Sequence, residues 1–296
     1  MLPRRDLLLV LIVCLVWAGN FLASASSMRH FPPLLFTALR MSVVLIVLLP
    51  WLKPVAASMR WRMVAAALLT NVLHFGLNFW ALRAAGDISS NAIALQSYIP
   101  MAALLAWWLL GEPIRWRSGL GIATAFIGVL VLGFDPLVLD APLALILCLI
   151  SAAVLALGMV LMRGLVGVHA FQLQAWSALM GVPLLFAASG LLEPIHLELL
   201  STASKLDWAG VLYSALAASL IGHGLLYVLV QRHPVALVSP FLLLTPVFAV
   251  TLGVLVWGDR PGPRLWVGGA LVLAGVLVVA LRGRSKALQS VRARQS

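Results

Sequence analysis

Long apolar runs alternate with short polar breaks along the whole chain of 296 residues. A bilayer core of about 30 Å is crossed by roughly 20 apolar residues in a helix. Backbone polar groups in lipid must be bonded internally, which favours helices over open sheet. The pattern therefore predicts an all-α integral membrane protein with ten transmembrane helices, at residues 6–27, 33–52, 61–84, 90–110, 117–134, 141–162, 170–192, 208–230, 236–257 and 265–282.

One spaced pattern, Gly-acid-x4-Arg-x3-Gly-x6-Gly, occurs at the end of each half of the chain, starting at Gly111 and again at Gly258. A repeat of this length indicates one structural unit used twice. Five spans per unit is an odd number, so the second unit would be inverted, which is typical of secondary transporters. We expect two inverted five-helix repeats around a central cavity, at 1–137 and 138–284, and a basic cytoplasmic tail at 285–296. The glycines of spans 5 and 10 are expected to serve helix packing.

Basic residues are unevenly divided between the two sides of the predicted bundle. With the N-terminus in the cytoplasm, fourteen Lys and Arg residues fall inside and five fall outside, while Arg40 lies within span 2. This excess satisfies the positive-inside rule, and ten spans then place both termini in the cytoplasm. Arg117 is inside and Arg264, at the equivalent place in the second copy, is outside, which supports the inversion independently.

Composition agrees with a membrane protein, since 63% of residues are hydrophobic, 10% are charged and the mean hydropathy is +1.08. The net charge of +11 could also indicate a nucleic-acid partner, but no nucleic-acid motif accompanies it. Membrane lipid and a small molecule are the expected partners. Cys14 and Cys148 lie in apolar runs and are interpreted as small buried hydrophobes. Residues 4–25 also resemble a secretory signal; we favour an uncleaved first span, because its loss would leave nine.

Polar side chains within spans are costly and usually face other helices or an aqueous cavity. In span 3, His74 and Asn78 share one helical face, and in span 8 His223 and Tyr227 do the same. Spans 1, 3, 4, 6, 8 and 9 are the expected cavity lining. The candidate substrate-binding residues are His74, Asn78, Gln96, Tyr98, Trp17, Asn20, His223 and Tyr227. Each histidine could instead bond a neighbouring helix, and Tyr98 and Trp17 could belong to an interfacial aromatic belt.

Three prolines and one arginine stand out within the spans. Pro100, Pro240 and Pro246 remove intrahelical hydrogen bonds and are predicted to kink or hinge their helices. Arg40 lies roughly 10 Å into span 2 at 1.5 Å per residue. It could pair with a substrate carboxylate or bond backbone carbonyls, and we favour the structural role.

Some chemistry is missing from the sequence. No Asp or Glu lies near the middle of a predicted span, so the carboxylate that many antiporters use for proton exchange has no counterpart. No phosphate-binding glycine loop, metal-ligand cluster or catalytic serine motif occurs. The sequence therefore argues against an enzyme and predicts no cofactor.

The motifs resemble the drug/metabolite transporter (DMT) superfamily in its ten-span EamA-type branch. The resemblance covers nearly the whole chain and rests on residues 17–21 (WAGNF), Pro33, Arg40 and the series from Pro100 to Gly128 with its second copy. It implies two inverted five-helix halves around a central cavity, and export of amino acids or related metabolites. The aromatic amino-acid exporter type (YddG-like) is similar in having a polar span 3 with a central histidine. This chain has only three tyrosines, which argues against strict aromatic specificity.

The leading prediction is a secondary transporter that exports amino acids or similar small metabolites across the plasma membrane, the inner membrane of a bacterium, by alternating access. A cavity with apolar walls, amides and an imidazole suits a zwitterion with a moderately apolar side chain. Efflux of amphipathic drugs is the alternative transport function, and a membrane enzyme or scaffold is an alternative of another class.

Overall fold

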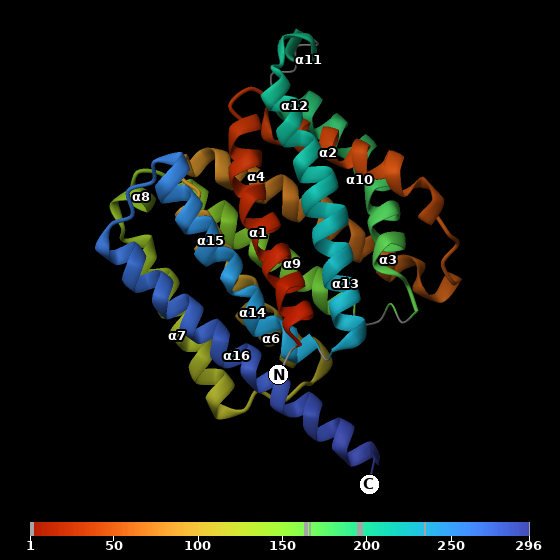
Figure 1. Ribbon diagram of the computed structural model, residues 1–296, viewed down its shortest axis with the longest axis vertical. Helices are drawn as coiled ribbons and strands as arrows, with labels where there is room; N and C mark the ends of the chain where they lie inside the picture. The colour runs from red at the N-terminus through yellow and green to blue at the C-terminus, as the bar shows by residue number, and fades with distance from the viewer. Residues whose placement is uncertain (1–2, 163–164, 166, 194–197, 234, 296) are drawn as a thin grey trace.

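The computed structural model describes residues 3–162, 165, 167–193, 198–233 and 235–295, and all regular structure within them is helical (Figure 1). Ten helices are long and apolar enough to cross a membrane, which confirms the all-α membrane fold. Each of their ends lies within four residues of the predicted boundary. They run over Arg4–Ser27, Pro33–Trp51, Ala57–Ala85, Ser89–Leu110, Trp116–Gly133, Pro142–Met162, Ala170–Leu192, Lys205–Leu226, Pro240–Trp257 and Pro263–Leu281.

Several spans are composed of more than one helical element. Spans 1–5 contain α1 (Arg4–Ser27), α2 (Pro33–Leu48), η1 (Leu49–Trp51), η2 (Ala57–Met59), α3 (Arg60–Ala67), η3 (Leu68–Leu73), α4 (His74–Ala85), α5 (Ser89–Ala94), η4 (Leu95–Ser97), α6 (Tyr98–Leu110) and α7 (Trp116–Gly133). Spans 6–10 and their loops contain α8 (Pro136–Leu139), α9 (Pro142–Met162), α10 (Ala170–Leu192), α11 (Glu198–Thr202), α12 (Lys205–Leu212), η5 (Tyr213–Gly222), α13 (His223–Arg232), α14 (Val235–Leu242), α15 (Leu244–Leu252), η6 (Gly253–Trp257) and α16 (Pro263–Gln295).

Spans 3, 4, 8 and 9 depart from regular α-helix. In spans 3 and 8 the segments η3 and η5 are π-helical, and span 9 ends in the π-helical η6. Span 4 has a 3₁₀ turn just before Pro100, and span 9 is interrupted at Leu243, between Pro240 and Pro246. A proline at these places cannot donate the intrahelical hydrogen bond. The three predicted hinge prolines therefore lie at or beside helix irregularities, while movement about them stays a prediction.

The doubled glycine pattern lies at one close contact between α7 and α16, which run side by side in Figure 1. A Cβ atom added to Gly128 would lie 2.6 Å from the carbonyl oxygen of Gly268, and one added to Gly121 would lie 2.9 Å from that of Gly275. The earlier glycine of one helix thus meets the later glycine of the other, so the two helices are antiparallel. Absence of side chains lets their backbones approach closely.

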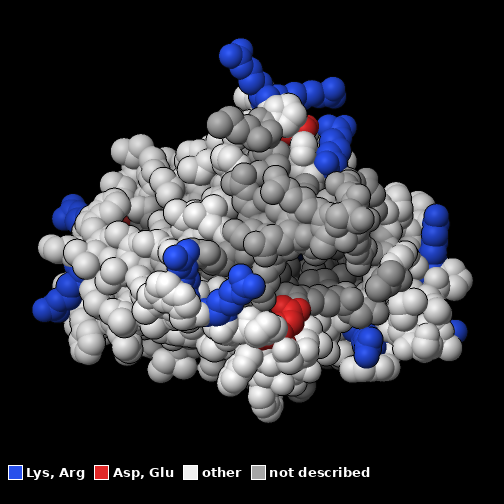
Figure 2. All heavy atoms as spheres, turned by 90° about the horizontal axis from the view of Figure 1, so that it is seen from below, with Lys and Arg blue, Asp and Glu red and all other residues white. Residues whose placement is uncertain are grey.

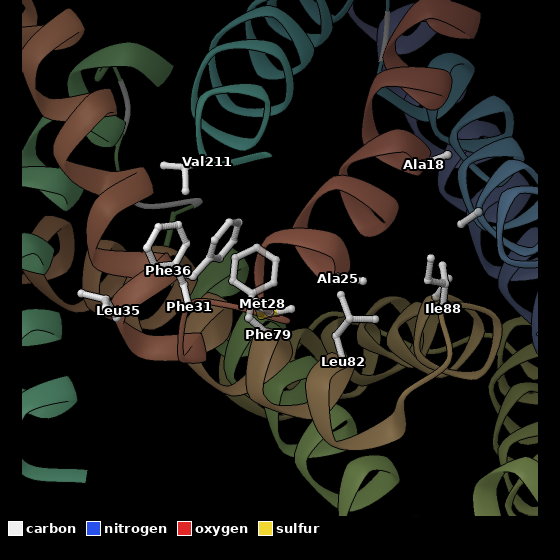
Figure 3. Close-up of a cluster of buried hydrophobic side chains, with 12 residues drawn as sticks. Ala18, Ala25, Met28, Phe31, Leu35, Phe36, Phe79, Leu82, Ile88 and Val211 are labelled. Carbon is white, nitrogen blue, oxygen red and sulfur yellow. The ribbon is translucent and has the colours of Figure 1, made fainter. Parts of the chain in front are cut away.

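The largest apolar cluster holds α1, α2, α4 and α12 together (Figure 3). Phe36 and Phe79 meet edge to face with ring centroids 5.0 Å apart, and Phe31 packs on Trp208 in the same manner at 5.3 Å. Edge-to-face contact places a positive ring edge on a negative ring face. Phe79 also faces the guanidinium of Arg40, so it connects this apolar cluster to the polar centre described below.

Both chain ends lie on one side of the molecule, at the bottom of Figure 1. Figure 2 shows this face from below, with Lys and Arg side chains both at its edges and on the face itself. On it, Asp6 of α1 accepts hydrogen bonds from Arg232 at 3.1 Å and His233 at 2.7 Å, which ties span 1 to the end of span 8. Helix α16 continues through the basic segment at 285–295.

The opposite face is held by carboxylates that cap helix ends from a distance in sequence. Glu193 accepts from the backbone N–H groups of Leu34 and Leu35, at the start of α2. Asp259 does the same for Ser89 in the first turn of α5, and Asp135 for Leu265 in the first turn of α16. The first N–H groups of a helix have no partner within it, so each carboxylate both satisfies donors and joins two spans.

Candidate functional site

Polar side chains from several spans converge on Ala218 and Ser219, in the π-helical segment η5; we call this the Ser219 cluster. Trp17 of α1 donates from its indole Nε1 to the Ala218 carbonyl at 3.2 Å. His223 approaches the same carbonyl with Nδ1 at 3.1 Å, and a carbonyl only accepts, so Nδ1 is the donor. The ring centroids of Trp17 and His223 lie 5.2 Å apart. The structure thus brings together two predicted site residues from opposite halves of the sequence.

Two residues absent from the predicted site complete the Ser219 cluster. Arg40 of α2 donates to the Ser219 hydroxyl from Nη2 at 2.9 Å and from Nε at 3.3 Å. Gln174 of α10 donates its amide to the Ser219 carbonyl at 3.3 Å. Both side chains are buried. Spans 2 and 7 therefore contribute to the polar centre, although neither was predicted to line the cavity.

His74, at the start of α4 in span 3, is buried and is hydrogen-bonded to span 6. The Ser151 hydroxyl donates to the His74 backbone carbonyl at 2.9 Å and lies 2.7 Å from the ring Nδ1. Because the single hydroxyl proton is used on the carbonyl, Nδ1 must be the donor to Ser151. The ring nitrogen Nε2 then has its lone pair available as an acceptor. The His74 and Phe75 rings are tilted by 49° with their centroids 4.9 Å apart, and Phe75 in turn contacts Arg40.

The other predicted residues of spans 1, 3 and 4 make more local contacts. Asn78 accepts from the Asn91 amide at 3.3 Å, which joins α4 to α5. Gln96 donates to the Ala92 carbonyl of its own span at 3.4 Å, and Tyr98 begins α6. A small cavity is lined by Asn91 and other residues of α5, α8 and α9, and it reaches Cys148; among the described residues, none of the predicted site residues lines it.

Two predicted residues remain. Asn20 of α1 accepts from the Ser24 hydroxyl at 3.4 Å. Tyr227 lies in α13, and its side chain is outside the described part of the structure.

Both candidate histidines follow a π-helical segment directly. Segment η3 ends at Leu73 and η5 ends at Gly222, so His74 and His223 each begin the next α-helix. A π-helical turn carries one extra residue and re-aims the side chains beside it, and such turns are frequent at functional sites. His74 and His223 therefore occupy matching positions in spans 3 and 8. Hydropathy could not predict this match, because it carries no signal for a π-helix.

Near the opposite face, the Asp87 carboxylate is buried between spans 3 and 4. It accepts from the Ser90 backbone N–H at 2.7 Å and from the Ser90 hydroxyl at 2.6 Å. Burial raises the pKa of Asp87 to about 6, with a further rise from the charges of Asp259 and Asp135, against the lowering effect of the Ser90 hydrogen bonds. Among the described residues, no three His, Cys, Asp or Glu side chains are grouped so as to hold a metal ion.

Known proteins similar to this chain were found by sequence and by structure. It is 25% identical over 286 residues to a probable amino-acid metabolite efflux pump of Escherichia coli (strain K12), covering 94% of this chain and 95% of that protein. It is 27% identical to a protein of the same description from Salmonella typhimurium, at the same coverages. A protein of Pseudomonas aeruginosa described as uncharacterized is 30% identical, with coverages of 93% and 94%.

A solved crystal structure shares the fold, with a TM-score of 0.65 at 21% identity over 95% of this chain and 97% of that one. The model of the EamA-like transporter family matches residues 5–134 and 142–281, which is nearly the whole sequence. This protein therefore belongs to the EamA-like transporter family of the drug/metabolite transporter superfamily and is a membrane transporter, not an enzyme.

Proposed function

We propose that this protein exports amino acids or similar small metabolites from the cytoplasm across the plasma membrane by alternating access. The observation that carries the proposal is the Ser219 cluster, where an indole, an imidazole, a guanidinium and an amide meet inside an apolar bundle. Polar groups at membrane depth are costly and mark substrate pathways. Two relatives described as probable amino-acid metabolite efflux pumps support the same substrate class.

The irregular spans support alternating access. Spans 3 and 8 are π-helical next to the candidate histidines, and spans 4 and 9 are interrupted beside Pro100, Pro240 and Pro246. Bending at such points would let the two halves rock around a fixed site. The Asp6 pairs on the face with the termini, and the Glu193 cap on the other face, are contacts that would open in turn.

The orientation we propose places both termini in the cytoplasm of a bacterial cell and the Asp87 face outside. The distribution of Lys and Arg in the sequence supports it. We also infer that residues 1–137 and 138–284 are inverted repeats, since the equivalent helices α7 and α16 pack antiparallel through equivalent glycines.

Amphipathic drugs are the other candidate cargo, and the charge at the centre disfavours most of them. Many such compounds are cations. The charged side chain of the Ser219 cluster is Arg40, and like charges repel strongly in a medium of low dielectric constant. An anion or a zwitterion is the better electrostatic match.

The test is uptake into proteoliposomes with a panel of labelled L-amino acids, with and without a pH gradient. We expect saturable uptake of neutral apolar amino acids that is accelerated by unlabelled amino acid on the opposite side, which is the signature of alternating access. Protein-free liposomes are the control. Transport of a lipophilic drug without transport of any amino acid would overturn the proposal.

A further inference from the structure

Arg40 is a fully buried cation, 1% exposed, for which the structure describes no anionic partner. Its guanidinium meets the Ser219 hydroxyl and lies 3.8 Å from the Phe75 ring centroid and 5.5 Å from that of Phe79. The carboxylate pairs found among the described residues involve Asp6, at the edge of the bundle. Within the described part of the chain, the guanidinium nitrogen Nη1 has no hydrogen-bond partner.

Such an arrangement is costly for a purely structural residue. Removing a charge from water has a large free-energy cost, and the contact of a cation with an aromatic ring recovers only part of it. A structural arginine would be expected to use its donors on backbone carbonyls, as Arg264 does with the Phe134 carbonyl at 2.8 Å. Arg40 uses one hydroxyl and leaves Nη1 unused.

Two further polar atoms, in residues bonded to Ser219, are buried without a partner among the described residues. They are the Gln174 amide oxygen and the Ser214 hydroxyl. Gln174 donates to the Ser219 carbonyl, and the Ser219 hydroxyl donates to the Ser214 carbonyl at 2.9 Å, so both residues are joined to Arg40 through Ser219. The Ser219 cluster therefore holds one unused cationic donor and at least one unused acceptor around the same residue. A buried polar group without a partner destabilises the fold, and a ligand of complementary charge would satisfy both the unused donor and the unused acceptor.

We propose that Nη1 of Arg40 binds the carboxylate of the transported substrate, and that the Gln174 amide oxygen accepts from its ammonium group. This inference deepens the proposed export function and rests on it for the identity of the ligand. Arginine suits a carboxylate because its N–H groups form directed, charge-assisted hydrogen bonds. Ser219, within the π-helical segment η5, bonds the guanidinium, and Phe75, two residues after the end of η3, lies against it.

The test uses four probes that share the isobutyl side chain of leucine, on the purified full-length protein in detergent. L-leucine has both charges, L-leucinamide and 3-methylbutylamine lack the carboxylate, and 4-methylpentanoate lacks the ammonium. Binding is measured as ligand-dependent thermal stabilisation. We expect leucine and 4-methylpentanoate to bind, and leucinamide and the amine to bind at least about tenfold more weakly, because a charged hydrogen bond contributes more than the 1.4 kcal/mol that a factor of ten requires.

Variants assign the effect to its residues. Arg40→Gln should abolish the preference for leucine over leucinamide, and Arg83→Gln, which removes an exposed arginine of α4, should preserve it. Gln174→Met, of similar size, should weaken leucine several-fold and leave 4-methylpentanoate unchanged. The wild-type preferences need no variant, so they decide the case if Arg40→Gln fails to fold.

The outcomes separate this inference from the proposed function. Equal binding of leucine and leucinamide, or a preference that survives Arg40→Gln, would overturn the carboxylate site while amino-acid export stands. Binding of 4-methylpentanoate without leucine would overturn amino-acid export and support the carboxylate site. If none of the four probes binds, the carboxylate site is rejected.

Discussion

Ser151 determines how His74 is presented, because its hydroxyl bonds both the backbone and the ring of that residue. Ser151→Ala should therefore lower amino-acid uptake roughly two- to thirteenfold, which corresponds to the 0.5–1.5 kcal/mol of one hydrogen bond. His74→Ala should lower uptake by at least as much. Uptake into proteoliposomes at equal protein content is the measurement.

The matched control is Ser42→Ala, which removes a hydroxyl that bonds only the Ala38 carbonyl of its own helix. Its uptake should equal that of wild type. Full activity in both Ser151→Ala and His74→Ala would remove His74 from the candidate site, and loss in His223→Ala alone would move the site to the second half.

Asp87 should make stability depend on pH. Its pKa in the folded protein is about 6, against an ordinary value of 3.8, so the folded state binds the proton more tightly than the unfolded chain. The free energy of unfolding should therefore fall by up to about 3 kcal/mol as pH rises from about 4 to about 6. Asp87→Asn keeps an acceptor for Ser90 and should remove this dependence, which leaves the variant more stable than wild type at pH 7.

Thermal unfolding of the purified protein at pH 4.5 and pH 7 measures the effect. Asp140→Asn, which alters an exposed carboxylate near the same face, should behave as wild type. A pH dependence that is unchanged in Asp87→Asn would show that other groups cause it.

At the residue scale, the sequence could predict polar side chains but not their partners. Trp17, His74 and His223 stand out in apolar runs and lie in or beside the polar centre. Arg40 was visible as a cation within a span, but the number of hydrogen bonds it makes depends on Ser219, far away in the chain. Gln174 and Ser151 carry no local signal, because one amide or hydroxyl in a span is compatible with many neighbours.

At the element scale, span positions follow from hydropathy because the lipid fixes the length of each apolar run. The interruptions of spans 4 and 9 follow from Pro100 and Pro246, since proline cannot complete the helix hydrogen bonds. The π-helical segments could not be predicted, because one extra residue per turn depends on packing between spans.

The contact between α7 and α16 gives a prediction at this scale. A Cβ atom at Gly128 would lie 2.6 Å from both the Gly268 carbonyl oxygen and the Val272 backbone nitrogen. Backbone cannot move aside as a side chain does, so Gly128→Ala should destabilise the protein by about 1–3 kcal/mol. Gly119→Ala on the same helix meets its nearest atom at 3.9 Å and should be neutral or slightly stabilising, since alanine favours helix.

The comparison of the two variants is made by thermal unfolding in one detergent. A lower midpoint is expected for Gly128→Ala only. Equal midpoints would mean that α7 and α16 separate without cost and that the glycines do not hold the two helices together.

The orientation that we propose for the whole molecule rests on the distribution of charge, and labelling of exposed positions tests it. Cys14 and Cys148 are both buried, so a thiol reagent that does not cross membranes should report an added cysteine. Ser58 is an exposed serine in η2, at the very start of span 3, and Ser201 is an exposed serine of α11, between spans 7 and 8. Two spans precede Ser58 and seven precede Ser201, an even and an odd number, so the two serines lie on opposite sides of the membrane. With the N-terminus in the cytoplasm, Ser201→Cys should react in intact spheroplasts and Ser58→Cys only after permeabilisation. The reverse pattern would overturn the proposed orientation, with both termini in the cytoplasm. Reaction of both cysteines in intact spheroplasts would contradict the ten-span topology itself.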